Sequence, residues 1–395
     1  MNQIFVQIAS YRDPELLPTI RDCIAKAKYP ERLTFGICWQ RDETESLEEF
    51  TYDPRFRIIA KHWRESKGLC WARSLIQKLW KGEKYTMQLD SHHRFLQDWD
   101  EILIDMMEMT KSPKPIITAY AGMYRPSDNT LLNHEPYKMV ASNFTSGGTI
   151  LFRPHHIENW ESLKAPIPAR FVSGHFFFPY GIHCEEYKYD PNIYFAGDEI
   201  SLAIRSFTLG YDLFHPHYTV VWHEYTREGR TKHWSDFVPE NNVEKPWWEM
   251  DNDSKRRLRH MLREENNGID LGEYGLGDVR THTDYELYAG IHFANRKLHP
   301  DTLRGIDPPT NDYSNWHILV EKEYHYVLNI PPVDDFKFIY IGIEDNKGNV
   351  LFRQDIQEYT PQIVAQFKSF DPPYKWVYWP VSSKGEWMER IDTQF

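Results

Sequence analysis

The sequence has few cysteines, no long apolar run and no block of positive charge. Its 395 residues contain 4 cysteines, Cys23, Cys38, Cys70 and Cys184, without CxxC spacing. This pattern argues against a disulfide framework or a zinc finger and predicts reduced thiols. No apolar stretch approaches the roughly 18 residues of a membrane-spanning helix, and the start MNQIFVQIASYRDPE lacks the basic and apolar regions of a signal peptide. We therefore expect a cytoplasmic protein without a transmembrane segment.

The charge balance is acidic. The formal net charge is −12 and the sequence pI is near 5.8, and Lys and Arg form no long run, so nucleic acid is not expected as a partner. Hydrophobic residues make up 41% of the chain and aromatic residues 15%, which suits a packed core and aromatic-lined clefts. The length favours two domains.

The N-terminal part alternates strand and helix patterns. Strands are predicted at 4–11, 33–40, 56–63 and 84–90, and helices at 14–27 and 69–80. This order predicts an α/β fold with a largely parallel sheet and helices on both faces. Ligands of such sheets bind beyond the carboxyl ends of the strands. Residues Ser10–Asp13 and Asp90–His92 are therefore expected to line one crevice.

The middle of the chain predicts further elements. Strands are expected at 115–124 and 147–154, a helix at 198–210 that ends at Gly210, and extended structure after it. The polar stretch DNDSKRRLRHMLREENNG is typical of a solvated helix.

The sequence pattern changes near residue 305, where a Pro-rich linker is followed by predicted strands with no helices between them. We expect a domain at 1–305 and a small all-β, sandwich-like domain at 306–395. The tail is rich in aromatic residues, namely Trp316, Tyr324, Tyr326, Trp376, Tyr378 and Trp379. These rings suit either a core, the favoured interpretation, or a platform that binds sugar or protein.

The stretch TMQLDSHHRF, Thr86–Phe95, contains a D-x-H triplet after an apolar run. In extended backbone Asp90 and His92 project from one face, so two metal ligands can converge. A carboxylate with an imidazole suits Mn²⁺ better than Ca²⁺, which prefers an all-oxygen shell. The triplet alone is a weak signal, because polar residues are common at strand ends, and His93 is either a bystander or a rival of His92.

In its context the triplet resembles the D-x-D or D-x-H metal motif of GT-A glycosyltransferases, which use nucleotide sugars. The chain resembles glycosyltransferase family 60, cytosolic N-acetylglucosaminyltransferases, more closely. The segments that carry this resemblance are FVQIASYRDPEL, QLDSHHRF, TSGGTILFRP and YGLGDVRTHTDYELYAGIHF, which lie between residues 4 and 293. The resemblance implies a GT-A catalytic domain, UDP-GlcNAc as donor, Mn²⁺ or Mg²⁺ as cofactor, and transfer with retention of configuration.

A second resemblance, to polypeptide N-acetylgalactosaminyltransferases, concerns FAGDEISLAIRSFTLGYDLFHPHYTVVWHEYTR. In that family a D-S-H motif is followed by a glycine-acidic helix and a distal histidine. The resemblance implies that His223 completes the metal shell with Asp90 and His92, with His215 and His217 as rivals. Under retention, Asp198 and Glu199 hold donor hydroxyls or orient the acceptor, and neither acts as a general base. A charged first helical turn is the alternative interpretation for both.

Other candidates concern the donor. The segment Ser10, Tyr11, Arg12 and Asp13 is expected to contact the nucleotide, or to form a capped turn before a helix. Lys67, Gly68 and Arg73 are candidates for binding the diphosphate, or belong to a solvated helix face. Gly147 and Gly148 either let backbone approach the sugar or form a turn. The stretch EGRTKHWSDF, residues 228–237, is expected to cover the donor as a lid.

The leading hypothesis is a metal-dependent retaining transferase that moves N-acetylglucosamine from UDP-GlcNAc to a hydroxyl group. The acceptor is hydroxyproline, Ser or Thr of a protein, or a glycan. One alternative is the same chemistry with UDP-GalNAc or UDP-glucose in polysaccharide synthesis. Another is a non-catalytic carbohydrate-binding protein that keeps the fold. A metallohydrolase is disfavoured because no H-E-x-x-H motif is present.

Overall fold

The structure is a computed structural model that describes residues 2–226, 229–310, 322–369 and 371–395. The chain forms two compact units, Met1–Tyr313 and Ser314–Phe395. The predicted boundary at 305/306 falls shortly before this division. Trp316 and the second half of the predicted linker, residues 311–316, lie outside the described residues.

The first unit is built on an eight-stranded sheet with the order β11-β13-β6-β12-β4-β1-β2-β3. Its strands are β1 (Ile4–Tyr11), β2 (Leu33–Arg41), β3 (Phe56–His62), β4 (Tyr85–Asp90), β6 (Pro115–Thr118), β11 (Ile167–Pro168), β12 (Phe176–Pro179) and β13 (Asp212–His215). Strands β3, β2, β1 and β4 are parallel neighbours. Strand β12 runs antiparallel between β4 and β6. The predicted α/β fold with a largely parallel sheet is confirmed, and the antiparallel β12 and β11 are additions to it.

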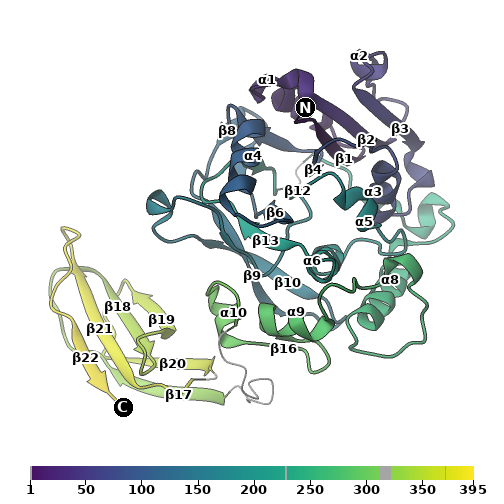
Figure 1. The fold of residues 1–395 in the computed structure, drawn as a ribbon. Coiled ribbons are helices and arrows are strands. Elements are labelled where there is room, and N and C mark those ends of the chain that lie inside the picture. Colours follow the sequence, from purple (N-terminus) through teal and green to yellow (C-terminus); the bar gives the residue numbers. More distant parts are fainter. Residues whose placement is uncertain (1, 227–228, 311–321, 370) are drawn as a thin grey trace. The chain divides into compact units, whose positions relative to one another are not determined.

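The described residues form ten α-helices, most of which are labelled in Figure 1. They are α1 (Leu16–Lys26), α2 (Glu48–Thr51), α3 (Leu69–Gln77), α4 (Trp99–Met109), α5 (His183–Glu186), α6 (Asp198–Thr208), α7 (His233–Asp236), α8 (Trp247–Met261), α9 (His282–Ala289) and α10 (Pro300–Arg304). The predicted helices at 14–27, 69–80 and 198–210 correspond to α1, α3 and α6, and the solvated helix to α8.

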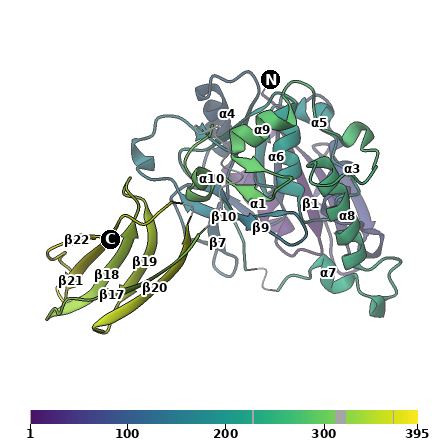
Figure 2. The same ribbon diagram turned by 90° about the horizontal axis from the view of Figure 1, so that it is seen from below.

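Side-chain alternation along the strands creates two apolar layers. In β1, Ile4, Val6 and Ile8 pack with residues of α1 and α4, whereas Phe5 packs with residues of α3. Strand β12 alternates in the same way, because Phe177 joins the residues of α6. Helices therefore cover both faces of the sheet, as the period-two pattern of a buried strand requires. On the second face α6 packs against α9 (Figure 2).

Two strands of a second, smaller sheet follow directly after the carboxyl ends of β4 and β6. This sheet has the order β5-β14-β7-β8 and consists of β5 (His93–Phe95), β14 (Val221–His223), β7 (Gly122–Arg125) and β8 (Thr130–Leu131). The prediction of a single strand at 115–124 is wrong, because this segment forms two strands, β6 and β7, which belong to different sheets. A hairpin of β9 (Tyr137–Phe144) and β10 (Ile150–His156) and a short pair, β15 (Ile291–His292) and β16 (Lys297–Leu298), complete the unit.

The second unit has two antiparallel sheets, β17-β20 and β19-β18-β21-β22. The strands are β17 (Lys322–Asn329), β18 (Phe336–Glu344), β19 (Val350–Ile356), β20 (Gln362–Ser369), β21 (Lys375–Ser382) and β22 (Ile391–Gln394). Side chains of both sheets, among them Leu328, Ile341 and Ala365, form one core. The predicted β-rich C-terminal region is confirmed. Tyr378 lies in this core and Trp376 packs against it.

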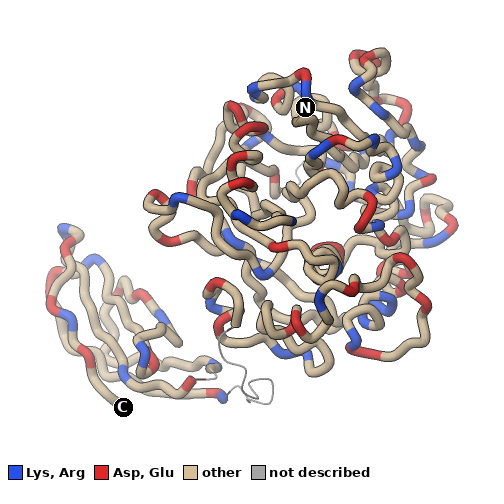
Figure 3. The backbone as a smooth tube through the Cα atoms, in the orientation of Figure 1, with Lys and Arg blue, Asp and Glu red and all other residues tan. Residues whose placement is uncertain are grey.

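Charged residues of both signs are interspersed along both units (Figure 3). None of the helices in the described parts of the chain combines the length and apolar character that a membrane crossing needs.

Candidate active site

The D-x-H triplet and a distant histidine meet at the carboxyl edge of the large sheet. Ligand atoms of Asp90, His92 and His223 all lie within 4.8 Å of one another. Nε2 of His223 is 3.4 Å from Oδ2 of Asp90, and Nε2 of His92 is 3.7 Å from the same oxygen. A carboxylate with two imidazoles suits Mn²⁺ or a similar divalent ion, so the residues fit the cation that the sequence implies.

Strand pairing brings His223 to this position. Strand β14 runs antiparallel to β5, with His223 opposite His93, and the backbone N–H of Glu224 donates to the carbonyl of His92 at 3.2 Å. The rival His215 lies elsewhere, because its Nδ1 donates to the carbonyl of Thr118 at 2.8 Å.

Asp13 orients His92. The Nδ1 atom of His92 is 2.7 Å from Oδ2 of Asp13, and the hydroxyl of Ser91 donates to the same oxygen at 2.7 Å. Because Asp13 accepts the Nδ1 proton, Nε2 carries the lone pair that a metal ligand needs. Asp13 is 5% exposed, and its other oxygen accepts from the backbone N–H of Glu15 at 2.9 Å.

His93 is outside the three-residue group. It is fully buried, and its Nδ1 is 3.1 Å from the backbone carbonyl of Asp90. Its Nε2 has no hydrogen-bond partner among the described residues. The ring centroids of His93 and His223 are 4.9 Å apart, so His93 packs behind His223.

Arg73 joins two carboxylates. Its Nη2 is 3.2 Å from Oδ1 of Asp90, its Nη1 contacts Asp198, and it donates to the carbonyl of Gly174 at 2.6 Å. The predicted alternative of a solvated helix face does not describe this side chain, which is only 2% exposed. Asp198, in the first turn of α6, also accepts from Sγ of Cys70 at 3.2 Å.

Two cavities meet at the candidate metal group. The larger has a volume of about 750 Å³ and the smaller about 160 Å³. Both are lined by Leu69, Asp90, Phe195 and His223. The three-residue group thus lies between them, where a bound cation would face both.

The smaller cavity contains part of the predicted nucleotide segment. Tyr11, Asp13 and Gly68 line it, together with Tyr194, His233 and Trp234, which sequence patterns alone did not single out. This aromatic lining suits a planar nucleobase. Gly68 has φ +102°, and a Cβ there would lie 2.6 Å from the ring of Tyr194, so glycine permits this wall.

The other donor candidates point elsewhere. Ser10 is fully buried, and Arg12 pairs with Asp42 at 3.0 Å and with Asp236 at 2.8 Å. Lys67 is exposed and is not among the residues that line either cavity. Local spacing cannot show these partners, because Arg12 and Asp236 are 224 positions apart.

Gly147 and Gly148 lie in the turn of the β9-β10 hairpin. Atoms of Lys255 and Arg259 on α8 surround the positions where Cβ atoms would be. The turn interpretation fits these two glycines, and Thr149 beside them lines the larger cavity.

The predicted lid is described from residue 229 onward. Arg230 contacts Glu224 at 2.5 Å and Asp13 at 3.3 Å, and its Nη1 lies 2.8 Å from Nε2 of His92. Arg230 to Trp234 line the smaller cavity. The segment therefore forms one wall of that cavity next to the metal group.

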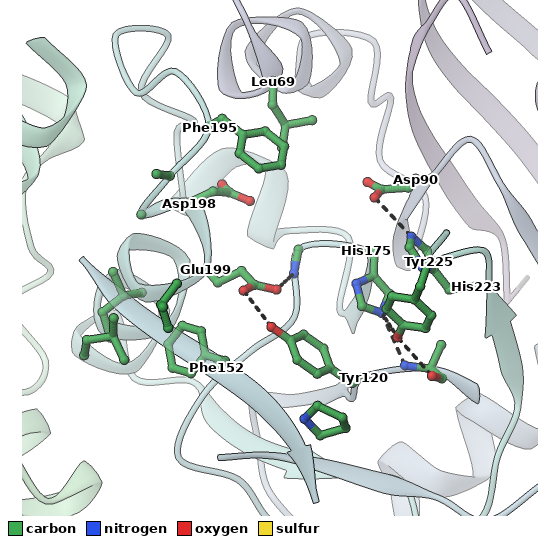
Figure 4. Close-up of a pocket in the computed structure, with 18 of the residues that line it drawn as sticks. Leu69, Asp90, Tyr120, Phe152, His175, Phe195, Asp198, Glu199, His223 and Tyr225 are labelled. Carbon is green, nitrogen blue, oxygen red and sulfur yellow. Dashed lines mark hydrogen bonds and ion pairs between the residues drawn. The ribbon is translucent and has the colours of Figure 1, made fainter. Parts of the chain in front are cut away.

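Glu199 faces the larger cavity (Figure 4). Its carboxylate accepts from the N–H of Gly174 at 3.1 Å and from the hydroxyl of Tyr120 at 3.2 Å. Burial raises the pKa of Glu199 to about 7. This carboxyl group can therefore donate or accept a hydrogen bond near neutral pH.

His175 and Tyr225 complete the same wall (Figure 4). The hydroxyl of Tyr225 is 3.2 Å from Nε2 of His175, and the His175 ring lies 4.3 Å from that of His223. The sequence did not single out His175, because a strand from another part of the chain delivers it. Tyr225 follows His223 at i+2, and this period-two signal could have identified it.

The family follows from a direct comparison. A family model described as Glycosyltransferase (GlcNAc) matches residues 3–55 and 47–295. The chain belongs to this family and is a glycosyltransferase, and its first unit has a mixed α/β fold. No curated protein matches the sequence.

Solved structures show more distant similarity. A crystal structure of GalNAc-T7 with UDP, GalNAc and Mn²⁺ is 12% identical, with a TM-score of 0.48, and the match covers 100% of this chain and 72% of that chain. S. aureus TarS is 8% identical with a TM-score of 0.42, covering 99% and 77%. Its fragment 1-349 is 10% identical with a TM-score of 0.38, covering 67% and 74%.

Proposed function

We propose that the protein is a metal-dependent retaining transferase that moves N-acetylglucosamine from UDP-GlcNAc to a hydroxyl group of a protein or glycan. The observation that carries this proposal is the position of Asp90, His92 and His223 between two cavities. One cavity takes the nucleotide and the other takes the sugar and the acceptor. The diphosphate then lies across the three residues.

The residues around the three-residue group have distinct tasks. When bound, the cation supplies Lewis-acid stabilisation of the negative charge on the departing diphosphate. Asp13 holds His92 in the ligating tautomer through its 2.7 Å contact. Arg230, at the cavity wall, adds positive charge next to the leaving group. Tyr11, Tyr194 and Trp234 bind the nucleoside.

Asp198 and Glu199, which line the larger cavity, have different roles. Asp198 is paired with Arg73, so it stabilises the cavity wall and is not available as a base. Glu199 holds a sugar hydroxyl, with Tyr120 fixing its orientation through a 3.2 Å hydrogen bond. In a retaining reaction the acceptor attacks on the side of the leaving group, and the departing phosphate takes its proton.

The proposed compartment is the cytoplasm. All four cysteines are free and buried, which suits a reducing environment.

The test is UDP release from UDP-GlcNAc, in the presence of Mn²⁺ and of EDTA, by the wild type and the variant Asp90→Ala. Turnover should fall to background in EDTA and in the variant. Asp105→Ala, which removes an exposed carboxylate of α4, should keep wild-type turnover. UDP-GalNAc and UDP-glucose in the same assay test the donor, and the anomeric configuration of the product by NMR tests retention. Full turnover by Asp90→Ala would contradict the proposal.

A further inference from the structure

The outer face of the four-stranded sheet carries a row of aromatic side chains. In β18, the core-facing residues are Ile339, Ile341 and Ile343. Successive side chains of a strand point to opposite faces, so Phe338 and Tyr340 lie on the outer face. The antiparallel register places Tyr340 opposite Trp379 and Phe338 opposite Val381.

A hairpin after β21 adds a fourth ring. Trp387 forms a backbone bridge with Val381, and the N–H of Met388 donates to the carbonyl of Pro380 at 2.9 Å. The indole N–H of Trp379 donates to the carbonyl of Met388 at 3.0 Å. These bonds fix the Trp387 ring 4.2 Å from that of Trp379. We call Phe338, Tyr340, Trp379 and Trp387 the aromatic platform.

The rings of the platform meet at angles, because the Trp387 ring stands edge-on to Phe338 at 83° and is tilted by 37° from Trp379. Trp387 is 50% exposed, although the hairpin backbone holds it in place. A Cβ at Gly342 would lie 2.6 Å from the hydroxyl oxygen and 2.8 Å from a ring carbon of Tyr340. Glycine at this position therefore lets the Tyr340 ring lie along its own strand. Phe338, Tyr340 and Trp379 are half-buried and Trp387 is exposed, and aromatic surface that is held in place and open to solvent is typical of a binding site.

The charges around the platform are balanced. Arg390 lies 5.4 Å from the ring of Trp379 and pairs with Asp392 at 2.7 Å and with Glu344 at 3.2 Å. Arg353 lies 5.1 Å from the ring of Tyr340 and pairs with Asp355 at 2.8 Å. The cations next to the rings are neutralised, which disfavours a strongly charged partner, while their polar groups still border the platform.

We propose that the aromatic platform is a second carbohydrate site, separate from the candidate active site, that binds a neutral oligosaccharide. A pyranose has an apolar C–H face that stacks on an aromatic ring and a rim of hydroxyl groups that bind polar side chains. The platform offers rings for the apolar face and bordering polar groups for the hydroxyls. Its cations are already paired with carboxylates, so it does not attract an acidic polymer. This inference goes beyond the proposed transferase function, and neither depends on the other.

The test is calorimetric titration of the full chain with chitohexaose, cellohexaose and maltohexaose, which are all neutral. At least one should bind, and Trp387→Ala should weaken that binding by at least about tenfold, because a stacking partner is lost. Trp387→Phe keeps a ring and should bind within about threefold of the wild type. Trp248→Ala removes a tryptophan of α8 that is 39% exposed, and should bind as the wild type does.

Several results would overturn the proposal. Binding of none of the three sugars would do so, as would equal binding by wild type and Trp387→Ala. So would a dimer in light scattering that Trp387→Ala converts to a monomer without any sugar binding, since the platform would then be a protein interface. The Asp90→Ala variant should bind the oligosaccharide with wild-type affinity. Its loss of turnover and the loss of platform binding are therefore distinguishable.

Discussion

The guanidinium of Arg73 contacts the carboxylate of Asp90, with Nη2 3.2 Å from Oδ1. Its other terminal nitrogen contacts Asp198, so Arg73 links a proposed metal ligand to the first turn of α6. Burial opposes the charge of Arg73, but the nearby carboxylates outweigh it and raise the pKa of Arg73 above its ordinary value. The linked side chains form one wall of the larger cavity.

Replacement of Arg73 by Met should destabilise the fold strongly. The substitution leaves Asp198, which is 4% exposed, without its buried cation. Breaking a buried pair by removing one partner costs about 3–5 kcal/mol. Urea unfolding measures the change. The control Arg21→Met breaks the exposed pair with Glu49, where the side chains are 60% and 40% exposed, and should cost less than about 1 kcal/mol. Equal effects of the two variants would show that the buried link is unimportant for stability.

Replacement of Asp13 by Asn should weaken cation binding without unfolding the chain. Asparagine no longer provides the negative charge that fixes the tautomer of His92, and such orienting partners are worth roughly 10–100-fold in metal affinity. Mn²⁺ affinity measured by electron paramagnetic resonance checks this, with circular dichroism to confirm the fold. Asp42→Asn is the matched control, because Asp42 likewise pairs with an arginine, Arg12 at 3.0 Å, whereas the carboxylate that contacts His92 is that of Asp13. Unchanged Mn²⁺ affinity in Asp13→Asn would mean that Asp13 does not support the metal site and that its role is limited to the nucleotide cavity.

Features that depend on the local periodicity of apolar residues, or on polar residues at strand ends, could be predicted from the sequence. The alternation of strands and helices predicted the sheet, and the i, i+2 spacing of Asp90 and His92 predicted their convergence. The paired strands β1 and β4, with Ala9 opposite Asp90, brought the two predicted strand-end segments together. The position of His223 was predicted only through a resemblance, because it lies 131 positions after His92 in the chain.

Features that depend on long-range pairing could not be predicted. Strand β12 enters the sheet between β4 and β6 and brings His175 to the cavity, and no local pattern indicates this insertion. Local chemistry also failed to distinguish the arginines. Arg12 and Arg73 were both predicted to contact the donor, yet Arg12 pairs with Asp236 and Arg73 with Asp90. Which carboxylate an arginine meets is decided by the tertiary fold.

Replacement of Gly68 by Ala should cost more stability than the same change at Gly82. Both glycines have positive φ, +102° and +96°, but a Cβ at Gly68 would lie 2.6 Å from the ring of Tyr194, whereas nothing lies within 4 Å at Gly82. Gly82→Ala therefore measures the backbone strain alone, about 1–2 kcal/mol, and Gly68→Ala adds the clash.

Urea unfolding of both variants measures the difference, and UDP affinity should fall only for Gly68→Ala, because Gly68 and Tyr194 line the smaller cavity. Equal destabilisation by the two substitutions would mean that Tyr194 moves aside without cost.

The stability of the protein should contain a pH-dependent contribution from Glu199. The pKa of this carboxyl group rises from 4.5 to about 7 in the folded state, so the folded protein binds more protons than the unfolded chain between these values. Stability from this group is therefore complete below pH 4.5, falls as the pH rises, and levels off above about pH 7. The size is on the order of 2 kcal/mol, after allowance for partial exposure.

The Glu199→Gln variant removes this contribution, because glutamine has no proton to lose. Relative to the wild type, it should gain roughly 2 kcal/mol of stability between pH 5 and pH 8 in urea unfolding. Glu185→Gln, a change at an exposed residue of α5, should show a pH-independent difference within about 0.5 kcal/mol. A constant difference for Glu199→Gln across this range would mean that Glu199 is ionised throughout. Its carboxylate would then be a permanent acceptor for a sugar hydroxyl, with no proton to donate.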